Sequence, residues 1–203
     1  RVLLPQLKAL IWQQSADLVL EETGINSWSK ALYKQLPERL KEAAYWRNIL
    51  QHQTQSLGES KPLDGPIQVG HARHLLTAEV SQALLQGFRL TTDLKIDEAL
   101  LAALTSVITK TNHLSHLKVS LESHGREDLA EDIDVSQTLG WFTTEYPVVI
   151  ASEENLPGLI RNVKQAIRSV PDKGLGYMSL RYLDEMHKHG FSALEKANPS
   201  QVL

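Results

Sequence analysis

The chain has 203 residues, of which 42% are hydrophobic and 22% charged, and its formal net charge is -3 at pH 7. This size and balance are those of one ordinary soluble domain with a core, and they exclude a disordered or membrane-spanning chain. The mild negative charge gives no electrostatic reason to bind nucleic acid or an anionic membrane. The absence of cysteine excludes disulfides, thiolate nucleophiles and cysteine-held metals, and it fits the reducing cytoplasm.

The first part of the chain is predicted to be helical. Five apolar residues recur at helical spacing near the start: Leu3, Leu4, Leu7, Leu10 and Ile11. We therefore expect a helix that packs one apolar stripe onto another element, rather than a signal peptide. A second helix is expected from about Lys30 to Gln53, with Ser27 or Ser29 as its cap and a break or restart at Pro37. Its expected buried residues are Trp28, Leu32, Leu36, Leu40, Tyr45, Trp46 and Leu50.

Residues 56–66 form the best candidate for a linker. This run contains Gly, Pro and the dipeptide Asp-Gly, which discourage the interior of both helices and strands. We therefore expect a boundary near residue 60. It would separate a helical segment at 1–60 from an α/β segment at 61–203.

Strands and helices are expected to alternate after the linker. The predicted elements are a strand at Ile67–Leu76, a helix at Ala78–Gly87 capped by Thr77, a helix at Ile96–Lys110, strands at Leu117–Ser123 and Pro147–Ala151, a helix at Asn155–Ser169, and a tight glycine loop at Pro171–Gly176 before a short helical stretch. Apolar and polar residues alternate over 117–123, which predicts one buried and one polar face. The fold class predicted for the second part is therefore α/β (α+β).

The segment Leu-Glu-Ser-His-Gly-Arg-Glu at residues 121–127 concentrates charge at the end of a predicted strand. It brings two carboxylates, an imidazole and a guanidinium to a place where a strand can deliver side chains to a cleft. The simpler interpretation is a solvated strand-to-loop junction with surface ion pairs, which is what charge clusters usually are.

Two further segments change that interpretation, because together the three resemble the ordered motifs of epimerization domains of nonribosomal peptide synthetases. Residues 121–127 resemble the family motif Glu-Gly-His-Gly-Arg-Glu, with Ser123 in place of its first glycine. Residues 134–143 resemble Asp-x-Ser-Arg-Thr-Val-Gly-Trp-Phe-Thr, with Gln137 and Leu139 as departures.

The third motif is similar to Pro-x-x-Gly-x-Gly-Tyr-Gly and lies at residues 171–178, where Met178 replaces the last glycine. A condensation domain, the nearest relative, is expected to carry a Gly-x-Phe-x-Asn-Thr type of segment where this chain has Gly140–Thr143. The epimerization subtype is therefore preferred, and the resemblance covers nearly the whole chain.

The resemblance implies a chloramphenicol-acetyltransferase-like fold, in which two similar subdomains enclose a substrate tunnel. This chain would hold a helical remnant of the N-terminal subdomain and most of the C-terminal one. It is expected to start just after the family's His-His-x-x-x-Asp-Gly motif, because Arg1–Leu4 resembles the segment that follows, and to stop short of the final Phe-Asn-Tyr-Leu-Gly motif. The missing N-terminal subdomain, a peptidyl carrier protein and neighbouring synthetase domains are the expected partners.

The implied reaction removes the α-proton of an aminoacyl or peptidyl thioester on one face and returns a proton on the other. Glu122 is the expected catalytic carboxylate, paired with a histidine outside this chain, and Glu127 is the fallback. His124, Arg126 and Asp134 are expected to form a network that holds the loop, although His124 could instead bond Glu122 or the substrate. The other expected supporting or tunnel residues are Trp141, Thr143 and Tyr177, with Trp141 and Phe142 in the core or tunnel wall.

No intrinsic cofactor is expected, because the substrate would arrive on the phosphopantetheine arm of the carrier protein. A metal site is not expected at His113 and His116 or at His187 and His189, since no carboxylate or thiolate set accompanies them. Two alternatives stay open. One is condensation or another acyl transfer by the same fold, and the other is a non-catalytic module that docks carrier proteins.

Overall fold

The computed structural model describes residues 2–12, 23–53, 55, 57, 70–87, 93–127, 129, 132–183, 196 and 201–202. Three predictions fall outside these residues. They concern almost all of the linker, the boundary near residue 60, and the histidines His187 and His189. The chain divides into two compact units that alternate along the sequence. Unit 1 comprises Arg1–Gln51, Ser120–Pro147 and Pro171–Asn198, and unit 2 comprises His52–Val119, Val148–Val170 and Pro199–Leu203.

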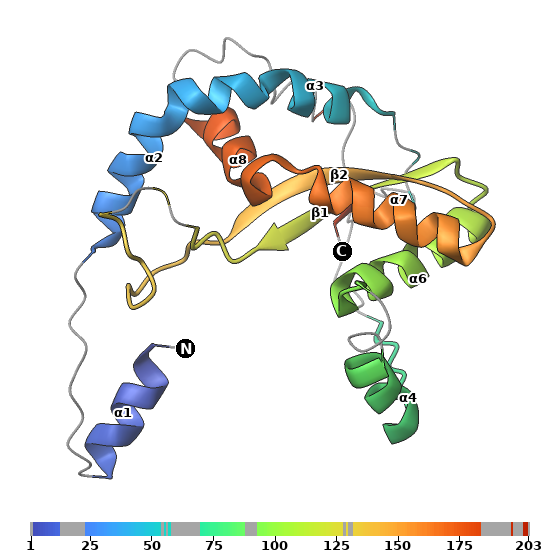
Figure 1. Ribbon diagram of the computed structural model, residues 1–203, viewed down its shortest axis with the longest axis horizontal. Coiled ribbons are helices and arrows are strands. Elements are labelled where there is room, and N and C mark those ends of the chain that lie inside the picture. The colour runs from blue at the N-terminus through green and yellow to red at the C-terminus, as the bar shows by residue number, and fades with distance from the viewer. Residues whose placement is uncertain are drawn as a thin grey trace, which may run out of the picture. The chain divides into compact units, whose positions relative to one another are not determined.

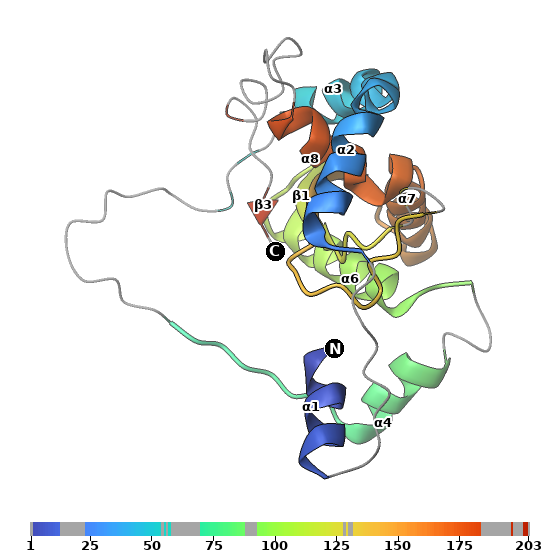
Figure 2. The same cartoon turned by 90° about the vertical axis from the view of Figure 1, so that its left-hand side faces the viewer.

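A small open sheet has the strand order β2-β1-β3 (Figures 1 and 2). Its strands are β1 (His116–Ser123), β2 (Thr144–Ala151) and β3 (Gln201–Val202). The predicted strands at 117–123 and 147–151 are confirmed, although β2 begins earlier, at Thr144.

The predicted polar face of β1 is wrong at Lys118. This residue is only 1% exposed. Its ammonium group lies 3.4 Å from the carbonyl oxygen of His52, so the buried charge meets a hydrogen-bond acceptor. The alternation of apolar and polar residues could not show that a backbone carbonyl group lies beside this lysine.

The described helices of unit 1 come from both parts of the chain. They are α1 (Leu3–Ile11), α2 (Ile25–Arg39), the 3-10 turn η1 (Leu40–Glu42), α3 (Ala43–Gln51), the 3-10 turn η3 (Pro171–Gly174) and α8 (Leu175–Tyr182). The first helix is confirmed, but it buries none of its residues, so the expected packing of its apolar stripe is not seen among the described residues.

The second predicted helix begins earlier than expected, at Ile25. Gly24 is its cap, so the expected serine caps, Ser27 and Ser29, lie inside the helix. Pro37 also lies inside α2, and the chain changes to the 3-10 turn η1 only at Leu40. A proline removes one backbone hydrogen bond, and here the change of helix type follows the proline instead of coinciding with it.

Two groups of aromatic rings form the core of unit 1, where α2 packs against α8 (Figure 1). Trp28 of α2 meets Phe142 edge to face, with ring centroids 5.0 Å apart. Trp46 of α3 is fully buried, and its ring centroid lies 5.0 Å from that of Tyr177 and 6.4 Å from that of Tyr146. The indole N–H of Trp46 donates to Glu42 at 3.0 Å, so the buried ring keeps its polar atom satisfied.

Unit 2 contains α4 (Ala78–Gln82), the π-helical turn η2 (Ala83–Gly87), α6 (Ile96–Thr111) and α7 (Leu156–Arg168), and α6 packs against α7. The predicted cap at Thr77 is confirmed, since its hydroxyl accepts the Val80 N–H at 3.3 Å. Asn155 caps α7 in the same way.

The strand predicted at 67–76 is wrong over its described part. Residues 70–76 have no regular secondary structure and are exposed. Alternating character alone cannot supply the neighbouring strand that backbone pairing requires. Among the helices of the described ranges, none has the length and apolar character needed to cross a membrane.

Candidate functional site

The first motif begins on the last residues of β1, in unit 1. Glu122 lies on this strand and is exposed. Its carboxylate makes no hydrogen bond or ion pair with any residue in the described ranges. The carboxylate is therefore accessible within the described part of the chain.

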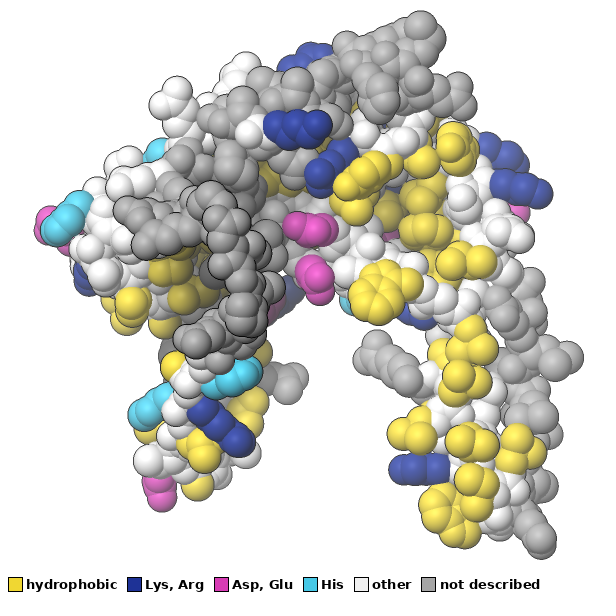
Figure 3. All heavy atoms as spheres, turned by 180° about the vertical axis from the view of Figure 1, so that it is seen from behind, with side chains coloured by type: hydrophobic (Ala, Val, Ile, Leu, Met, Phe, Trp, Pro, Cys, Tyr) yellow, Lys and Arg dark blue, Asp and Glu magenta, His cyan; other side chains and the backbone are white. Residues whose placement is uncertain are grey.

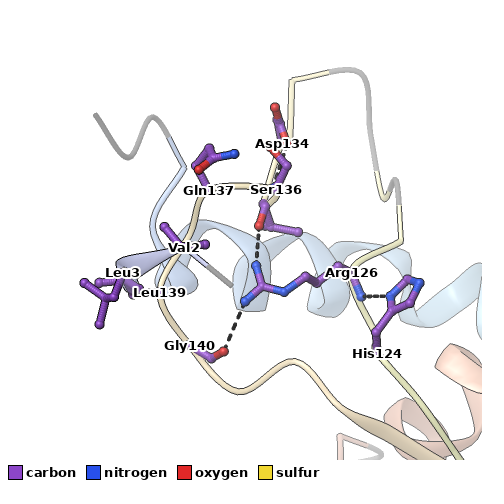
Figure 4. A pocket seen from close by; sticks show the side chains of 10 residues that line it. Val2, Leu3, His124, Arg126, Asp134, Ser136, Gln137, Leu139 and Gly140 are labelled. Carbon is purple, nitrogen blue, oxygen red and sulfur yellow. Dashed lines mark hydrogen bonds between the residues drawn. The ribbon is translucent and has the colours of Figure 1, made fainter. Parts of the chain in front are cut away.

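Arg126 folds the second motif back onto the first (Figure 4). Its guanidinium donates to the carbonyl oxygens of Val135, of Thr138 at 3.0 Å and of Gly140 at 3.3 Å. The same group lies 4.2 Å from the centre of the Phe142 ring. One side chain therefore satisfies three backbone carbonyls and a ring face, and it brings together two segments that the sequence could only show in order.

Asp134 shapes the start of the second motif and is exposed. Its carboxylate accepts the backbone N–H of Ser136 at 2.7 Å. This hydrogen bond and one from the Ser136 hydroxyl lower the pKa of Asp134. These bonds are those of a turn, so Asp134 holds the loop locally, through Ser136.

A pocket of about 620 Å³ opens beside this loop. Its lining includes His124, Arg126 and the loop from Asp134 to Gly140, with Val2 and Leu3 on another side (Figure 4).

His124, Glu127 and Lys173 form a chain of contacts beside the first motif. The backbone N–H of Arg126 donates to Nδ1 of His124 at 3.0 Å, and Nε2 of the same ring lies 3.7 Å from Oε1 of Glu127. Lys173 donates to the other carboxylate oxygen of Glu127 at 2.5 Å. Glu127 itself is 9% exposed. The fallback catalytic residue is thus a buried, ion-paired carboxylate.

The remaining candidates lie in contrasting surroundings. Trp141 is 84% exposed, which excludes a core position among the described residues and leaves the tunnel-wall alternative as a prediction, while its neighbour Phe142 is buried. Thr143 is half-buried. Tyr177 is buried against Trp46 and lies in the core of unit 1 instead of on an open surface.

Sequence reasoning missed Lys173 and its neighbour Asp172. Both have left-handed backbones, with φ of 52° and 40°, although neither is a glycine. Asp172 forms an ion pair with Arg39 of α2, as Lys173 does with Glu127. The only signal was their place in the third motif, which was interpreted as a turn.

Among the described residues, no group of three or more potential ligands could hold a metal ion. His116, one of the histidines considered, lies 2.8 Å from the carbonyl oxygen of Gln53 through Nε2, so this nitrogen serves a backbone contact.

Known proteins share this fold and much of this sequence. The family described as Condensation domain matches residues 10–194. Vanchrobactin synthetase of Vibrio anguillarum is 43% identical over 198 residues, which are 97% of this chain and 7% of that protein. The crystal structure of the epimerization domain from the third module of tyrocidine synthetase B is 31% identical with a TM-score of 0.69, over 89% of this chain and 42% of that one.

The first condensation domain of the CDA synthetase is 17% identical with a TM-score of 0.59, over 87% of this chain and 38% of that one, which is a likeness of fold alone. The chain thus spans less than half of each of these two solved domains. Its mixed helices and small open sheet are those of the condensation and epimerization fold. With nine-tenths of its length matched by the family, the chain belongs to the condensation-domain family of nonribosomal peptide synthetases.

Proposed function

We propose that this chain is part of an epimerization domain, which inverts the α-carbon of an aminoacyl or peptidyl residue held as a thioester on a carrier protein. The observation that carries the proposal is the pairing of the two motifs, in which Arg126 fastens the loop at 134–143 beside the strand that bears Glu122. The higher identity to an epimerization domain, 31% against 17% for a condensation domain, supports the same subtype.

In this proposal Glu122 acts as one of two opposed acid/base groups. Breaking the α C–H bond leaves an electron pair that the thioester carbonyl takes up as an enolate, and a proton returns to the opposite face of the carbon. A second group is needed on that face, and we expect a histidine from another part of the parent domain. The exposure of Glu122 requires the rest of the domain or the bound substrate to exclude water from it.

The substrate would reach Glu122 on the phosphopantetheine arm of a peptidyl carrier protein, so the domain needs no cofactor of its own. Neighbouring synthetase domains would deliver and receive that carrier. The reducing cytoplasm is the proposed location.

The test uses the parent domain with a carrier protein loaded with an L-aminoacyl group, in deuterated water. Wild type should incorporate deuterium at the α-carbon and give D-product. Glu122→Gln should slow both by about 100-fold or more, because the amide cannot exchange the proton. The readouts are mass spectrometry of the released acid and chiral chromatography.

The matched control is Glu154→Gln, which removes an exposed carboxylate of unit 2 and should leave the rate unchanged. Wild type without exchange on any loaded residue would contradict the proposal. Condensation is the second candidate, because the family match is to condensation domains, and it predicts peptide-bond formation when donor and acceptor carriers are both supplied.

A further inference from the structure

The turn that begins the third motif holds two side chains in a strained backbone. Asp172 (φ 40°, ψ 44°) and Lys173 (φ 52°, ψ 30°) are left-handed, a conformation that residues other than glycine rarely adopt. Both side chains form ion pairs, Asp172 with Arg39 and Lys173 with Glu127. The strain therefore coincides with contacts to two different segments, α2 and the first motif.

Glu127 receives only part of its hydrogen-bonding potential from Lys173. Lys173 occupies Oε2, whereas Oε1 is buried and has no hydrogen-bond partner among the described residues. Nε2 of His124 lies 3.7 Å from this oxygen. A buried carboxylate oxygen that lacks a donor is costly, so Glu127 favours a ring that presents an N–H toward it.

The hydrogen bond at the other ring nitrogen of His124 determines the tautomer of the ring. Nδ1 accepts the backbone N–H of Arg126 at 3.0 Å, and we assign the neutral tautomer from this bond, with the proton on Nε2 and facing Glu127. In this tautomer Nδ1 accepts the backbone N–H of Arg126 and Nε2 already carries a proton. His124 therefore has no free lone pair with which to take a proton from a substrate.

Between these two residues the backbone is tightly packed. Gly125 has φ of 64°, and a Cβ atom placed there would lie 1.6 Å from the carbonyl oxygen of Phe142. A small rotation of this backbone would therefore disturb the contact between the first and second motifs. The His124 bond to Arg126 spans this glycine and resists such a rotation.

We infer that Lys173, Glu127 and His124 form a positioning chain, which fixes the backbone at Gly125 and Arg126 and thereby the direction of Glu122 and the seating of the second motif. Lys173 and Glu127 are positioning residues in this inference, and neither Glu127 nor His124 exchanges a proton with the substrate. The inference rests on the proposed function of Glu122.

The kinetic test compares variants of the parent domain in the α-proton exchange assay. Lys173→Met should lower kcat by about 10-fold or more with little change in KM, because orientation and not binding is lost. Lys173→Arg, which keeps the ion pair, should recover most of the rate. Lys164→Met, which removes a lysine from the ion pair with Asp93 in unit 2, is the matched control and should leave kcat unchanged.

The pH dependence separates positioning from catalysis. Glu127→Gln and His124→Gln should lower kcat without removing either limb of the pH–rate profile, since neither group is an acid or base of the reaction. Loss of one limb in either variant would overturn the inference, as would a Lys173→Met enzyme with wild-type kcat. The double variant Lys173→Met/Glu127→Gln should be no slower than the slower single variant.

A second readout does not depend on activity. In the parent domain with ¹⁵N-labelled histidine, the His124 signal, assigned by its loss in His124→Gln, should report the Nε2–H tautomer, and Lys173→Met should shift it toward a mixture. An Nδ1–H tautomer in wild type would overturn the positioning chain. Absence of α-proton exchange with the expected tautomer would instead refute the proposed function, so the two failures are distinguishable.

Discussion

Position 125 of the first motif requires a glycine for two independent reasons. Its backbone is left-handed, with φ of 64°, and a Cβ atom would lie 1.6 Å from the Phe142 carbonyl oxygen and 3.3 Å from the Thr144 methyl group. Moving a backbone oxygen or a residue of a paired strand out of the way would cost free energy of folding. The glycine lets the first motif lie directly against the second.

Replacing this residue tests the packing of the two motifs. Gly125→Ala should lower the free energy of unfolding of the parent domain by about 2 kcal/mol or more, from left-handed strain together with the clash. Gly70→Ala is the control, because a Cβ atom there has no neighbour within 4 Å, and it should be almost neutral. Urea unfolding followed by tryptophan fluorescence measures both. A neutral Gly125→Ala would contradict the packing described above.

Motif resemblance could point to single residues of the site but not to their partners. It singled out Arg126, and the structure shows what that side chain does, because three carbonyl groups of the second motif converge on it. The pair of Glu127 and Lys173 joins residues 46 apart in the chain, through a left-handed turn that no spacing rule predicts. The exposure of Trp141 was equally hidden, since an aromatic residue beside a buried Phe142 resembles a core residue.

At the scale of elements, Arg168 joins the end of α7 to the start of α6. Its guanidinium donates to Glu98 at 2.9 and 3.3 Å and to the Asp93 carboxylate at 2.6 Å. Glu98 is 1% exposed and also accepts the backbone N–H of Lys95. Burial alone would raise the pKa of Glu98, but the bonds from Arg168 and Lys95 outweigh burial and lower it.

Arg168→Met should destabilise the packing of α6 on α7, because it leaves the Glu98 charge buried without its partner. The partial exposure of Arg168 makes the expected loss smaller than that for a fully buried pair. Arg161→Met, an exposed arginine on the same helix, is the control. Amide hydrogen exchange of the two helices in the parent domain measures the effect. Equal protection in both variants would contradict the role of this pair.

The same pair predicts a dependence on acid. The pKa of Glu98 in the folded protein is below its ordinary value of 4.5, so its contribution to stability is full above about pH 4.5 and is lost as the pH falls through the folded pKa. Wild type should therefore lose stability in that acidic window, and Arg168→Met should show a shallower loss.

Elements with a strong local signal were predictable, whereas elements that need a distant partner were not. The helices at 96–110 and 155–169 carry apolar periodicity or a capping residue within their own sequence, and the structure has α6 and α7 there. The strand predicted at 67–76 depended on a neighbour, and residues 70–76 have none in the described structure. The sequence does not predict the start of α2, because its N-cap is Gly24, which has no side chain that could form a capping hydrogen bond.

At the scale of the whole molecule, several helices carry apolar side chains that the described chain does not cover. Hydrophobic side chains gather along α1 (Figure 3), where Leu3, Leu4, Leu7, Leu10, Ile11 and Trp12 are each more than half exposed. Helix α6 has a buried face and an exposed apolar face. The buried face holds Leu101 and Ala102 together with polar side chains, and the exposed face carries Ile96, Leu100, Leu104 and Val107.

A helix that has an exposed apolar face opposite its buried face is usually covered on both sides. The chain spans 42% of the solved epimerization domain. In the proposed parent domain we expect an element outside these 203 residues to cover the exposed face of α6. The composition of the chain does not lead to this expectation, because it is that of one ordinary domain. The expectation comes from the motifs, which resemble those of a family of longer domains.

The exposed face of α6 therefore gives a prediction about the parent domain. Leu100→Gln, where the side chain is 54% exposed in this chain, should lower the free energy of unfolding of the complete domain by about 1–3 kcal/mol, the range for losing a buried leucine. Ser106→Gln, on the same helix but on neither of these two faces, should have a free energy of unfolding within about 0.5 kcal/mol of that of wild type. Thermal unfolding of the two variants and wild type decides the matter. If Leu100→Gln is as neutral as Ser106→Gln, the second face of α6 is open to solvent in the complete domain as well, and its apolar residues need another explanation.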